Sequence, residues 1–169
     1  MVKVIYGPRI VTFPGHIPVI RVRTTEDYLE ETIAELESKK YDLVVFSAAI
    51  LDYKPEGKLN EKVKSGRSEW YVKLVPAPKV INEVRRRFPD VEIIAFKLEH
   101  RATPDELIKR AMELLDKVNA ALVVANDISR ISGDYHEALI VDRMGNVHEF
   151  KGTKERLAIK IFDVLEDLL

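Results

Sequence analysis

The sequence contains no cysteine and no glutamine, and it has only seven glycines and one tryptophan among 169 residues. The absence of cysteine excludes disulfides, thiol catalysis and cysteine-ligated metals together. The glycines lie in no Gly-rich phosphate cradle, so there is neither a P-loop nor a dinucleotide-binding fingerprint. The four histidines lack metal-ligand spacing, and no serine lies in a nucleophile elbow. Several motif-defined classes of enzyme are therefore excluded.

Neither sign of charge predominates, because the sequence has 27 basic and 28 acidic residues and a formal net charge of −1. We therefore expect neither nucleic acid nor an anionic membrane as the main partner. The apolar runs are far shorter than the ~18 residues of a membrane span, and the first residues lack the pattern of a signal peptide. These features predict a cytoplasmic protein.

What is present is a 46% apolar share, enough for a core, and a 33% charged share. We expect a single domain over residues 1–169, since the chain shows no repeat, low-complexity tract or linker. Charged residues are frequent and thermolabile ones scarce in proteins from hot environments, so we also expect a thermophilic source.

Apolar strands alternate with amphipathic helices along the chain. Strands are predicted at residues 2–6, 17–22, 42–47, 69–75, 91–96 and 120–125. Helices are predicted to begin at Thr24 or Thr25, near Val80, at Thr103 and at Thr153, and Thr103-Pro104-Asp105-Glu106 is the clearest start signal. A hairpin is predicted from residues 138–141 and 147–150. The fold class is therefore α/β, with a mostly parallel sheet, helices on both faces and a C-terminal β-hairpin.

Candidate ligand-binding residues follow the buried strands, because ligands of open α/β sheets bind beyond the carboxyl ends of the strands. Small residues from Ser47 to Ala49 follow one strand, Phe96 and Glu99 another, and Asn126-Asp127 a third. Each also has a structural interpretation, since Asn-Asp often caps a helix and a strand-end Phe is usually core. Their convergence on one crevice favours a binding site.

Residues 54–68 form a long segment without periodicity that is rich in basic side chains. They carry Lys54, Lys58, Lys62, Lys64 and Arg67 against only Glu56 and Glu61. A basic lid over a crevice would suit a phosphate-bearing ligand, whereas charge alone favours a plain solvated loop.

Five motifs, in order and spacing, resemble one family. They are Ser47-Ala48-Ala49-Ile50-Leu51-Asp52-Tyr53, Glu61-Lys62-Val63-Lys64, Lys73-Leu74-Val75 before Pro78, Phe96 with Glu99, and Val124-Ala125-Asn126-Asp127. The chain from residue 2 onward resembles the phosphopantothenate–cysteine ligase domain, which is the synthetase half of the bifunctional coenzyme A biosynthesis flavoprotein.

The resemblance implies a Rossmann-like three-layer sandwich, a homodimer and a ligase that uses Mg²⁺ with CTP or ATP. In that reaction the carboxylate of 4′-phosphopantothenate attacks the α-phosphate of the nucleotide, and the amine of cysteine then displaces the nucleoside monophosphate. The flavin-bearing half of the family's bifunctional members has no counterpart here.

The resemblance also implies roles for particular residues. Lys62 matches the lid lysine that contacts the triphosphate and is the catalytic candidate. The nucleotide-binding candidates are Phe46, Ser47, Ala48, Asp52, Lys62, Pro78, Lys79, Val80, Ile81, Phe96 and Lys117. Further crevice candidates are Lys64, Glu99, Asn126 and Asp127, and no protein side chain is assigned to a metal.

The sequence departs from the family pattern at three points. Lys79 replaces the acidic residue of an Asn-Pro-Asp segment, and Glu113 stands where a second lysine is usual, with Arg110 as a substitute. The family's Gly-rich N-terminal segment is also missing from the sequence. The alternative to an active ligase is therefore a catalytically incomplete fragment, or a nucleotide-binding or dimerisation module of the same family.

Overall fold

The computed structural model describes residues 1–8 and 12–168. The chain divides into two compact units. The first comprises Met1–Ser38 with Ala49–Glu83, and the second Lys39–Ala48 with Val84–Leu169. The prediction of a single domain stays a prediction, and each unit is described by itself.

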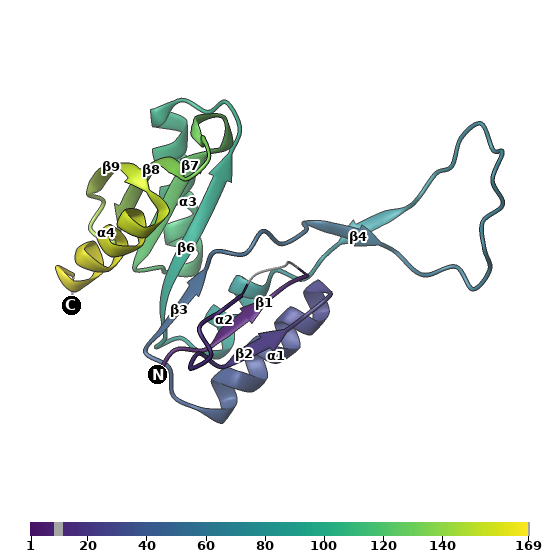
Figure 1. The fold of residues 1–169 in the computed structure, drawn as a ribbon, viewed down its shortest axis with the longest axis horizontal. Coiled ribbons are helices and arrows are strands. Elements are labelled where there is room, and N and C mark those ends of the chain that lie inside the picture. Colours follow the sequence, from purple (N-terminus) through teal and green to yellow (C-terminus); the bar gives the residue numbers. More distant parts are fainter. Residues whose placement is uncertain (9–11, 169) are drawn as a thin grey trace. The chain divides into compact units, whose positions relative to one another are not determined.

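The second unit is built on a five-stranded sheet in the order β3-β6-β7-β8-β9 (Figure 1). Its strands are β3 (Leu43–Phe46), β6 (Glu92–Glu99), β7 (Leu122–Asp127), β8 (Tyr135–Asp142) and β9 (Val147–Thr153). β3, β6 and β7 pair in parallel, whereas β8 and β9 are antiparallel to their neighbours. The α/β class and the C-terminal hairpin are confirmed, and the sheet is mixed.

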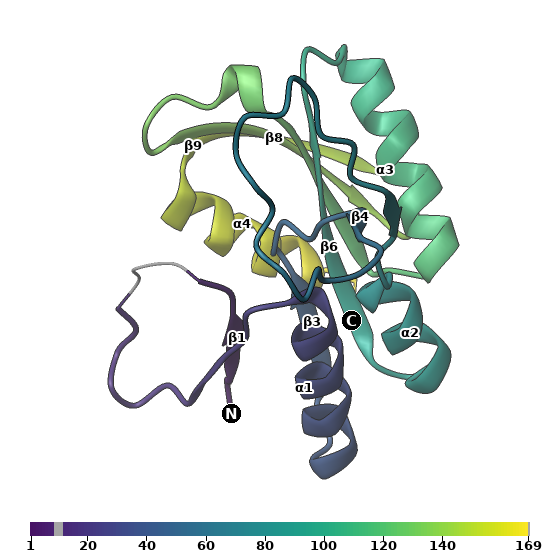
Figure 2. The same ribbon diagram turned by 90° about the vertical axis from the view of Figure 1, so that its right-hand side faces the viewer.

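Helices α3 (Pro104–Val118) and α4 (Lys154–Glu166) lie on opposite faces of this sheet, as Figure 2 shows. β7 is buried along its whole length, as expected for a central strand covered on both sides. The apolar side chains of the α4 face form one cluster with the inner face of that helix. Its members include Ile94, Leu122, Val124, Ile140, Leu157, Ile161 and Val164.

Both helices begin where the sequence predicts. Thr103 accepts a hydrogen bond from the Glu106 backbone N–H, and the Glu106 carboxylate accepts one from the Thr103 N–H at 2.8 Å, which completes a capping box. Thr153 caps α4 by accepting a hydrogen bond from the N–H of Arg156. Between β7 and β8 lies a short 3₁₀ turn, η1 (Ile128–Arg130).

The turn of the β8–β9 hairpin is organised by Asp142, which is 2% exposed. Its carboxylate accepts hydrogen bonds from the N–H groups of Met144 (2.9 Å) and Asn146 (3.0 Å), from Asn146 Nδ2 (3.0 Å), and lies 3.0 Å from His148 Nε2. Gly145 takes a φ of 84°, which only glycine adopts at little cost. Burial alone would raise the pKa of Asp142, but the hydrogen bonds from His148 and Asn146 outweigh it and hold that pKa below its ordinary value.

Replacing Asp142 by asparagine is therefore expected to lower the free energy of unfolding at pH 7 by about 1–3 kcal/mol. Because the folded pKa is depressed, the carboxylate stabilises the fold above its unfolded pKa, and this stabilisation is lost as the pH falls through the folded value. Urea unfolding of both proteins at pH 7 and near pH 2 tests this. A gap between them that stays constant over that range would contradict the assignment.

The first unit contains a parallel pair of short strands, β1 (Val4–Tyr6) and β2 (Val19–Arg21), with helix α1 (Thr25–Ser38). Thr24 and Asp27 exchange hydrogen bonds at the start of α1, as the sequence predicts. Lys3 Nζ lies 2.5 Å from Glu35 Oε2 of the helix.

The remaining strands of this unit are β4 (Tyr53–Pro55) and β5 (Leu74–Pro76), which pair antiparallel. The chain between them, residues 56–73, is the basic loop, and it extends well beyond the strand pair (Figure 1). Helix α2 (Val80–Arg87) follows, and the chain passes from the first unit to the second within it. No helix in the described ranges is both long and apolar enough to cross a bilayer.

Two predictions about strands are wrong in part. The strand predicted at residues 69–75 is present only as β5, because its partner β4 has three residues. Beyond the pair, Glu56 N–H donates to Lys73 O at 3.0 Å, and residues 69–72 face no strand in the described structure. The strand predicted at 42–47 forms as β3 but is not covered on both faces, since Val45 is 42% exposed. β3 is an edge strand of its sheet, which explains the difference.

Candidate functional site

The carboxyl ends of β3, β6 and β7 bring several predicted site residues of the second unit together. Phe46 ends β3 and is buried, and the exposed Ser47 and Ala48 follow it. Phe96 pairs with Val124, and Glu99 pairs with Asp127 where β6 and β7 both end. This edge of a parallel sheet is where α/β proteins bind ligands.

Asp127 organises the loops at this edge. It is 1% exposed, and its carboxylate accepts hydrogen bonds from Ser129 Oγ (2.5 Å), Ser129 N (2.7 Å) and Ala102 N (2.5 Å). The Ser129 hydroxyl above all, with the backbone N–H groups, holds the pKa of Asp127 well below its ordinary value. Asp127 thus caps η1 and ties the β6–α3 loop to the end of β7, so its carboxylate positions the crevice loops.

Glu99 forms a charged cluster at the same edge. Its Oε2 lies 2.9 Å from Arg110 of α3, and its Oε1 lies 3.1 Å from Lys97 Nζ. Two cations on one largely buried carboxylate leave a net positive charge beside the crevice, which suits an anionic ligand. The sequence pointed to Arg110 only as a substitute for a family lysine, whereas the structure shows it beside Glu99.

Lys117 is not brought to this edge. It lies in the last turn of α3, and the loop after that helix returns to the start of β6, where Ala121 N–H donates to Ile93 O at 2.8 Å. The helix rises about 1.5 Å per residue, so Lys117 and Arg110 are separated by roughly 10 Å along it. Among the cations of α3, Arg110 is the better placed for a ligand in this crevice.

Asn126 is the residue at this edge whose side chain is best suited to bind a ligand. It is 9% exposed, and its amide has no hydrogen-bond partner in the described part of the chain. Phe96 is half-buried and packs against the apolar cluster of the α4 face. Both side chains point to that face, because Phe96 pairs with Val124 and Asn126 lies two residues after Val124 on β7.

The first unit brings together a second set of predicted residues. Asp52 and Lys79 form an ion pair, and Ala77 N–H donates to Asp52 O at 2.9 Å. The lysine that replaces the family's acidic residue therefore acts as a counter-ion of the predicted nucleotide-binding aspartate. Val80 is 1% exposed, so its side chain is core, but the free N–H groups at the start of α2 remain suited to an anion.

The basic loop carries Lys62 and Lys64 in its outer part, where the charges are unpaired, whereas the lysines at its base form ion pairs. Lys73 pairs with Glu56 at 2.6 Å where the loop begins and ends, and Lys54 of β4 pairs with Glu26. Within the described residues no ion pair engages the cations farther out, which are Lys58, Lys62, Lys64 and Arg67. These charges are exposed and free to meet a polyanion.

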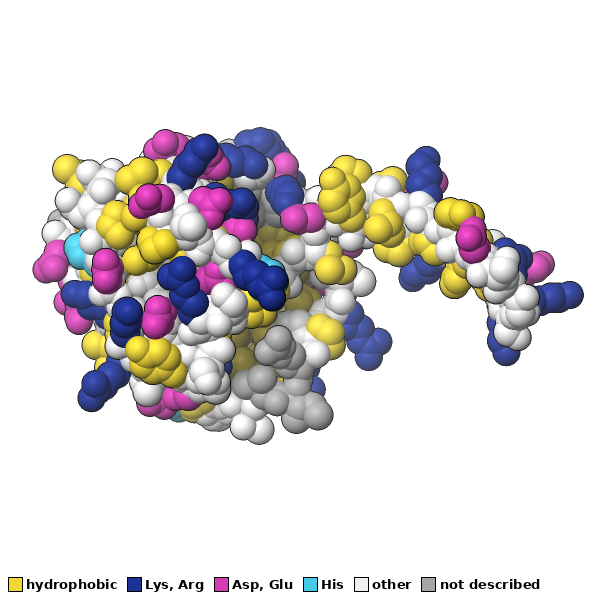
Figure 3. Space-filling model, turned by 90° about the horizontal axis from the view of Figure 1, so that it is seen from above, with side chains coloured by type: hydrophobic (Ala, Val, Ile, Leu, Met, Phe, Trp, Pro, Cys, Tyr) yellow, Lys and Arg dark blue, Asp and Glu magenta, His cyan; other side chains and the backbone are white. Residues whose placement is uncertain are grey.

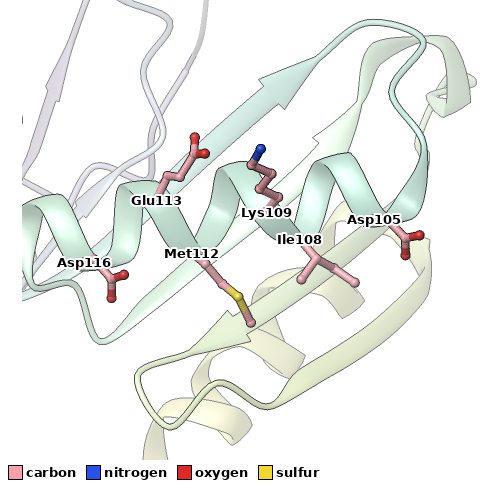
Figure 4. Close-up of a pocket in the computed structure, with 6 residues that line it drawn as sticks. All are labelled: Asp105, Ile108, Lys109, Met112, Glu113 and Asp116. Carbon is pink, nitrogen blue, oxygen red and sulfur yellow. The ribbon is translucent and has the colours of Figure 1, made fainter.

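One surface depression, of about 460 Å³, lies along the outside of α3. Figure 4 shows that all its labelled residues, Asp105, Ile108, Lys109, Met112, Glu113 and Asp116, belong to that single helix. None of them is a predicted site residue, so the depression is a feature of the helix surface. In residues 1–8 and 12–168, no group of three or more His, Asp or Glu side chains is placed to hold a metal ion.

The chain has relatives among known proteins. The sequence profile described as "DNA/pantothenate metabolism flavoprotein C-terminal domain" matches residues 1–169. The chain is 35% identical over 150 residues to the coenzyme A biosynthesis bifunctional protein CoaBC of Thermococcus kodakarensis, and 35% identical over 161 residues to that of Methanocaldococcus jannaschii. These matches cover 89% and 92% of this chain but 37% and 38% of the relatives, so the chain spans under two-fifths of their length.

Solved structures show the same fold. The DNA/pantothenate metabolism flavoprotein from Streptococcus pneumoniae superposes with a TM-score of 0.85 at 26% identity, over 99% of this chain and 81% of that one. The C-terminal domain of a coenzyme A biosynthesis bifunctional protein CoaBC superposes with a TM-score of 0.74 at 23% identity, over 99% and 75% of the two chains.

Proposed function

The chain belongs to the family of the DNA/pantothenate metabolism flavoprotein C-terminal domain, and from this premise we propose that it is a cytoplasmic phosphopantothenate–cysteine ligase of coenzyme A biosynthesis. The observation that carries the proposal is the match of this family over all 169 residues, alongside two relatives named for coenzyme A biosynthesis. The substrates would be 4′-phosphopantothenate, cysteine and CTP or ATP.

The proposed chemistry joins two anions in its first step. The carboxylate oxygen of 4′-phosphopantothenate forms a bond to the α-phosphorus, the bond to the β-phosphate oxygen breaks, and pyrophosphate leaves. The cysteine amine then attacks the acyl carbon of the mixed anhydride, loses a proton and releases CMP or AMP. Cations are needed to offset the repulsion of the first step and the charge of the leaving group.

The unpaired cations of the basic loop support this assignment. Lys62 is the residue we place on the triphosphate, with Lys64 beside it on the same loop. Asp52, Pro78, Lys79 and the first turn of α2 are the nucleotide-binding candidates of the first unit. Phe46, Ser47, Ala48, Phe96 and Asn126 are the corresponding candidates of the second unit.

We assign the Mg²⁺ to the nucleotide phosphates rather than to a cage of protein ligands. Mg²⁺ keeps several waters and is usually bound by one or two carboxylates together with substrate phosphates. Its chemistry would be to neutralise charge on the triphosphate, while the residues above bind and orient the nucleotide.

Release of pyrophosphate from the purified chain tests the function. The chain is incubated with Mg²⁺, CTP or ATP and 4′-phosphopantothenate, before and after cysteine is added. Release that depends on phosphopantothenate is expected, and the nucleotide that supports it is the substrate. Binding of nucleotide without any release would instead favour the incomplete or non-catalytic module.

We also propose that the protein is a homodimer whose contact includes the basic loop. Trp70 and Tyr71 are 58% and 86% exposed, and Val72 and Leu74 are each at least half exposed. Figure 3 shows hydrophobic side chains along this stretch, with Lys and Arg side chains at its end. Exposed apolar patches of this kind mark interaction surfaces.

Replacing Trp70 and Tyr71 together by serine is expected to shift the protein from dimer to monomer. Light scattering coupled to size-exclusion chromatography measures the mass directly. Replacing the equally exposed Ile159 of α4 by serine is the control, and it should leave the dimer intact. A wild-type monomer, or a dimeric double variant, would contradict the proposal.

A further inference from the structure

The two faces of β3 differ in burial. Phe46 is 7% exposed and pairs with Ala95, which is 1% exposed, on the face opposite α4. Val45 points to the α4 face, because it pairs with Ile94 of the apolar cluster that α4 covers. Val45 is nevertheless 42% exposed, whereas Ile94 is completely buried. α4 therefore covers β6 at this position but does not cover Val45 beside it.

The uncovered surface continues along β6. Leu98 lies four residues after Ile94 and points to the same face, and it is 49% exposed. Phe96 lies between them and is half-buried, and Leu43 at the start of β3 is only partly buried. These four apolar side chains of the α4 face, Leu43, Val45, Phe96 and Leu98, are called the β3–β6 surface below.

The outer edge of β3 is open as well. In the described residues β3 pairs only with β6, so the backbone groups on its other side have no strand partner. Natural edge strands often block further pairing with lysine or proline, and the sequence Leu-Val-Val-Phe of β3 contains neither. An apolar strand of this composition is typical of the interior of a parallel sheet, with a strand on each side and helices on both faces.

We propose that the β3–β6 surface binds a strand–helix segment supplied from outside residues 1–169, with its strand parallel to β3 and its helix on the α4 side. A parallel strand is connected through a crossover, which in α/β proteins is usually a helix packed on one face of the sheet. The face of Phe46 is already covered, so the helix lies on the face of Val45 and Leu98. The segment would carry an apolar, β-branched strand and a helix with an apolar stripe.

Other occupants fit this surface less well. An antiparallel strand from a hairpin would satisfy the edge of β3 but would leave Val45 and Leu98 exposed. Two copies of the chain related by a two-fold axis would pair their β3 edges antiparallel, and this contact would add no helix either. The two solved structures that superpose on 99% of this chain do so over 81% and 75% of their own length, so each contains residues without a counterpart here.

Binding of a synthetic peptide tests the inference. The peptide has the sequence of about 40 residues, enough for a strand, a helix and their connections, that directly precedes the matched region in the Thermococcus kodakarensis relative. Calorimetry measures its affinity for the purified chain, and hydrogen exchange measures the protection of the β3 amides with and without it. We expect a saturable complex in which exchange at residues 43–46 slows about 10-fold or more. No substrate is present, so the result is independent of the proposed ligase function.

Val45→Lys separates this surface from general stickiness. A lysine there would be buried under the bound helix, so the affinity for the peptide should fall about 10-fold or more. The free variant should melt within about 2 °C of the wild type, because Val45 is exposed and lysine is common on edge strands. Ile159→Lys is the matched control. Ile159 is 63% exposed and lies two residues from both Leu157 and Ile161, so it points away from the sheet and should leave the affinity unchanged.

Three results would overturn the inference. The first is no binding of this peptide or of the corresponding peptide from the Methanocaldococcus jannaschii relative. The second is full protection of the β3 amides in the free chain at every protein concentration, which would mean that this chain covers β3 itself. The third is protection that is lost on dilution, which would indicate a second copy. Each would leave the proposed function standing, whereas a peptide-bound chain that releases no pyrophosphate would contradict only that function.

Discussion

Replacing Lys62 by glutamine is expected to lower phosphopantothenate-dependent pyrophosphate release by about 10²- to 10³-fold. Attack of a carboxylate on a triphosphate accumulates negative charge, and Lys62 is an exposed cation with no ion pair in the described residues. Its charge is therefore available to the ligand in full. Glutamine keeps the length and polarity of the side chain but removes the charge, so the loop itself should be unaffected.

Lys58→Gln is the matched control for this experiment, since it removes the same charge from the same loop. Turnover and nucleotide affinity are measured for both variants and for the wild type. A loss confined to Lys62→Gln supports a specific contact with the triphosphate. An equal loss in both variants would indicate only the general potential of the loop, and unchanged turnover in Lys62→Gln would refute its assignment.

Local signals predicted the helices of this fold well. Thr103 with Glu106, and Thr24 with Asp27, place a hydroxyl and a carboxylate three residues apart, so each forms its reciprocal cap without help from distant contacts. The hairpin turn at Asp142 was visible for the same reason, since its Gly145 lies within the turn that it forms. These elements depend on residues close together in the chain.

Strand burial was predicted less well, because it depends on neighbours that are distant in sequence. Val45 is apolar and β-branched, which is typical of a central strand. β3 pairs only with β6 in its sheet, however, so Val45 is 42% exposed. Trp70 and Tyr71 are typical strand residues, yet no strand faces them in the described structure. Composition indicates that a residue suits a strand, and the topology decides whether a partner exists.

Site residues could be predicted where a motif directly follows a strand. They could not be predicted where the pairing of strands distant in sequence determines which side chains are neighbours. Asn126 and Asp127 were found together because they end one strand, although only the structure separates the unpartnered amide from the carboxylate that fixes the loops. Lys117 was assigned through the family resemblance, and the direction of α3 places it near the amino ends of the strands.

Arg85 is the residue of the second unit whose replacement should destabilise it most. It lies in α2. Its guanidinium donates to backbone carbonyls at the C-terminal end of α3 and in the segments that directly follow α2 and α3. Its acceptors are Val118 O (2.7 Å), Val91 O (2.8 Å), Asn119 O (3.1 Å), Phe88 O (3.3 Å) and Pro89 O. The last carbonyls of a helix have no partner within it, so one side chain satisfies two helix ends.

Arg85→Lys is expected to lower the free energy of unfolding by about 2–4 kcal/mol, which corresponds to a fall of about 5–15 °C in melting temperature. Burial lowers the pKa of Arg85, but a guanidinium stays charged, and its planar fork reaches several carbonyls that a single ammonium cannot reach together. Lysine keeps the charge, so the loss reports hydrogen-bond geometry rather than charge. Arg156→Lys, on the exposed side of α4, is the control, and calorimetric melting of both variants gives the comparison. If the two variants melted within about 2 °C of each other, the carbonyls would have to be satisfied by water as well as by Arg85, and the helix ends would not depend on it.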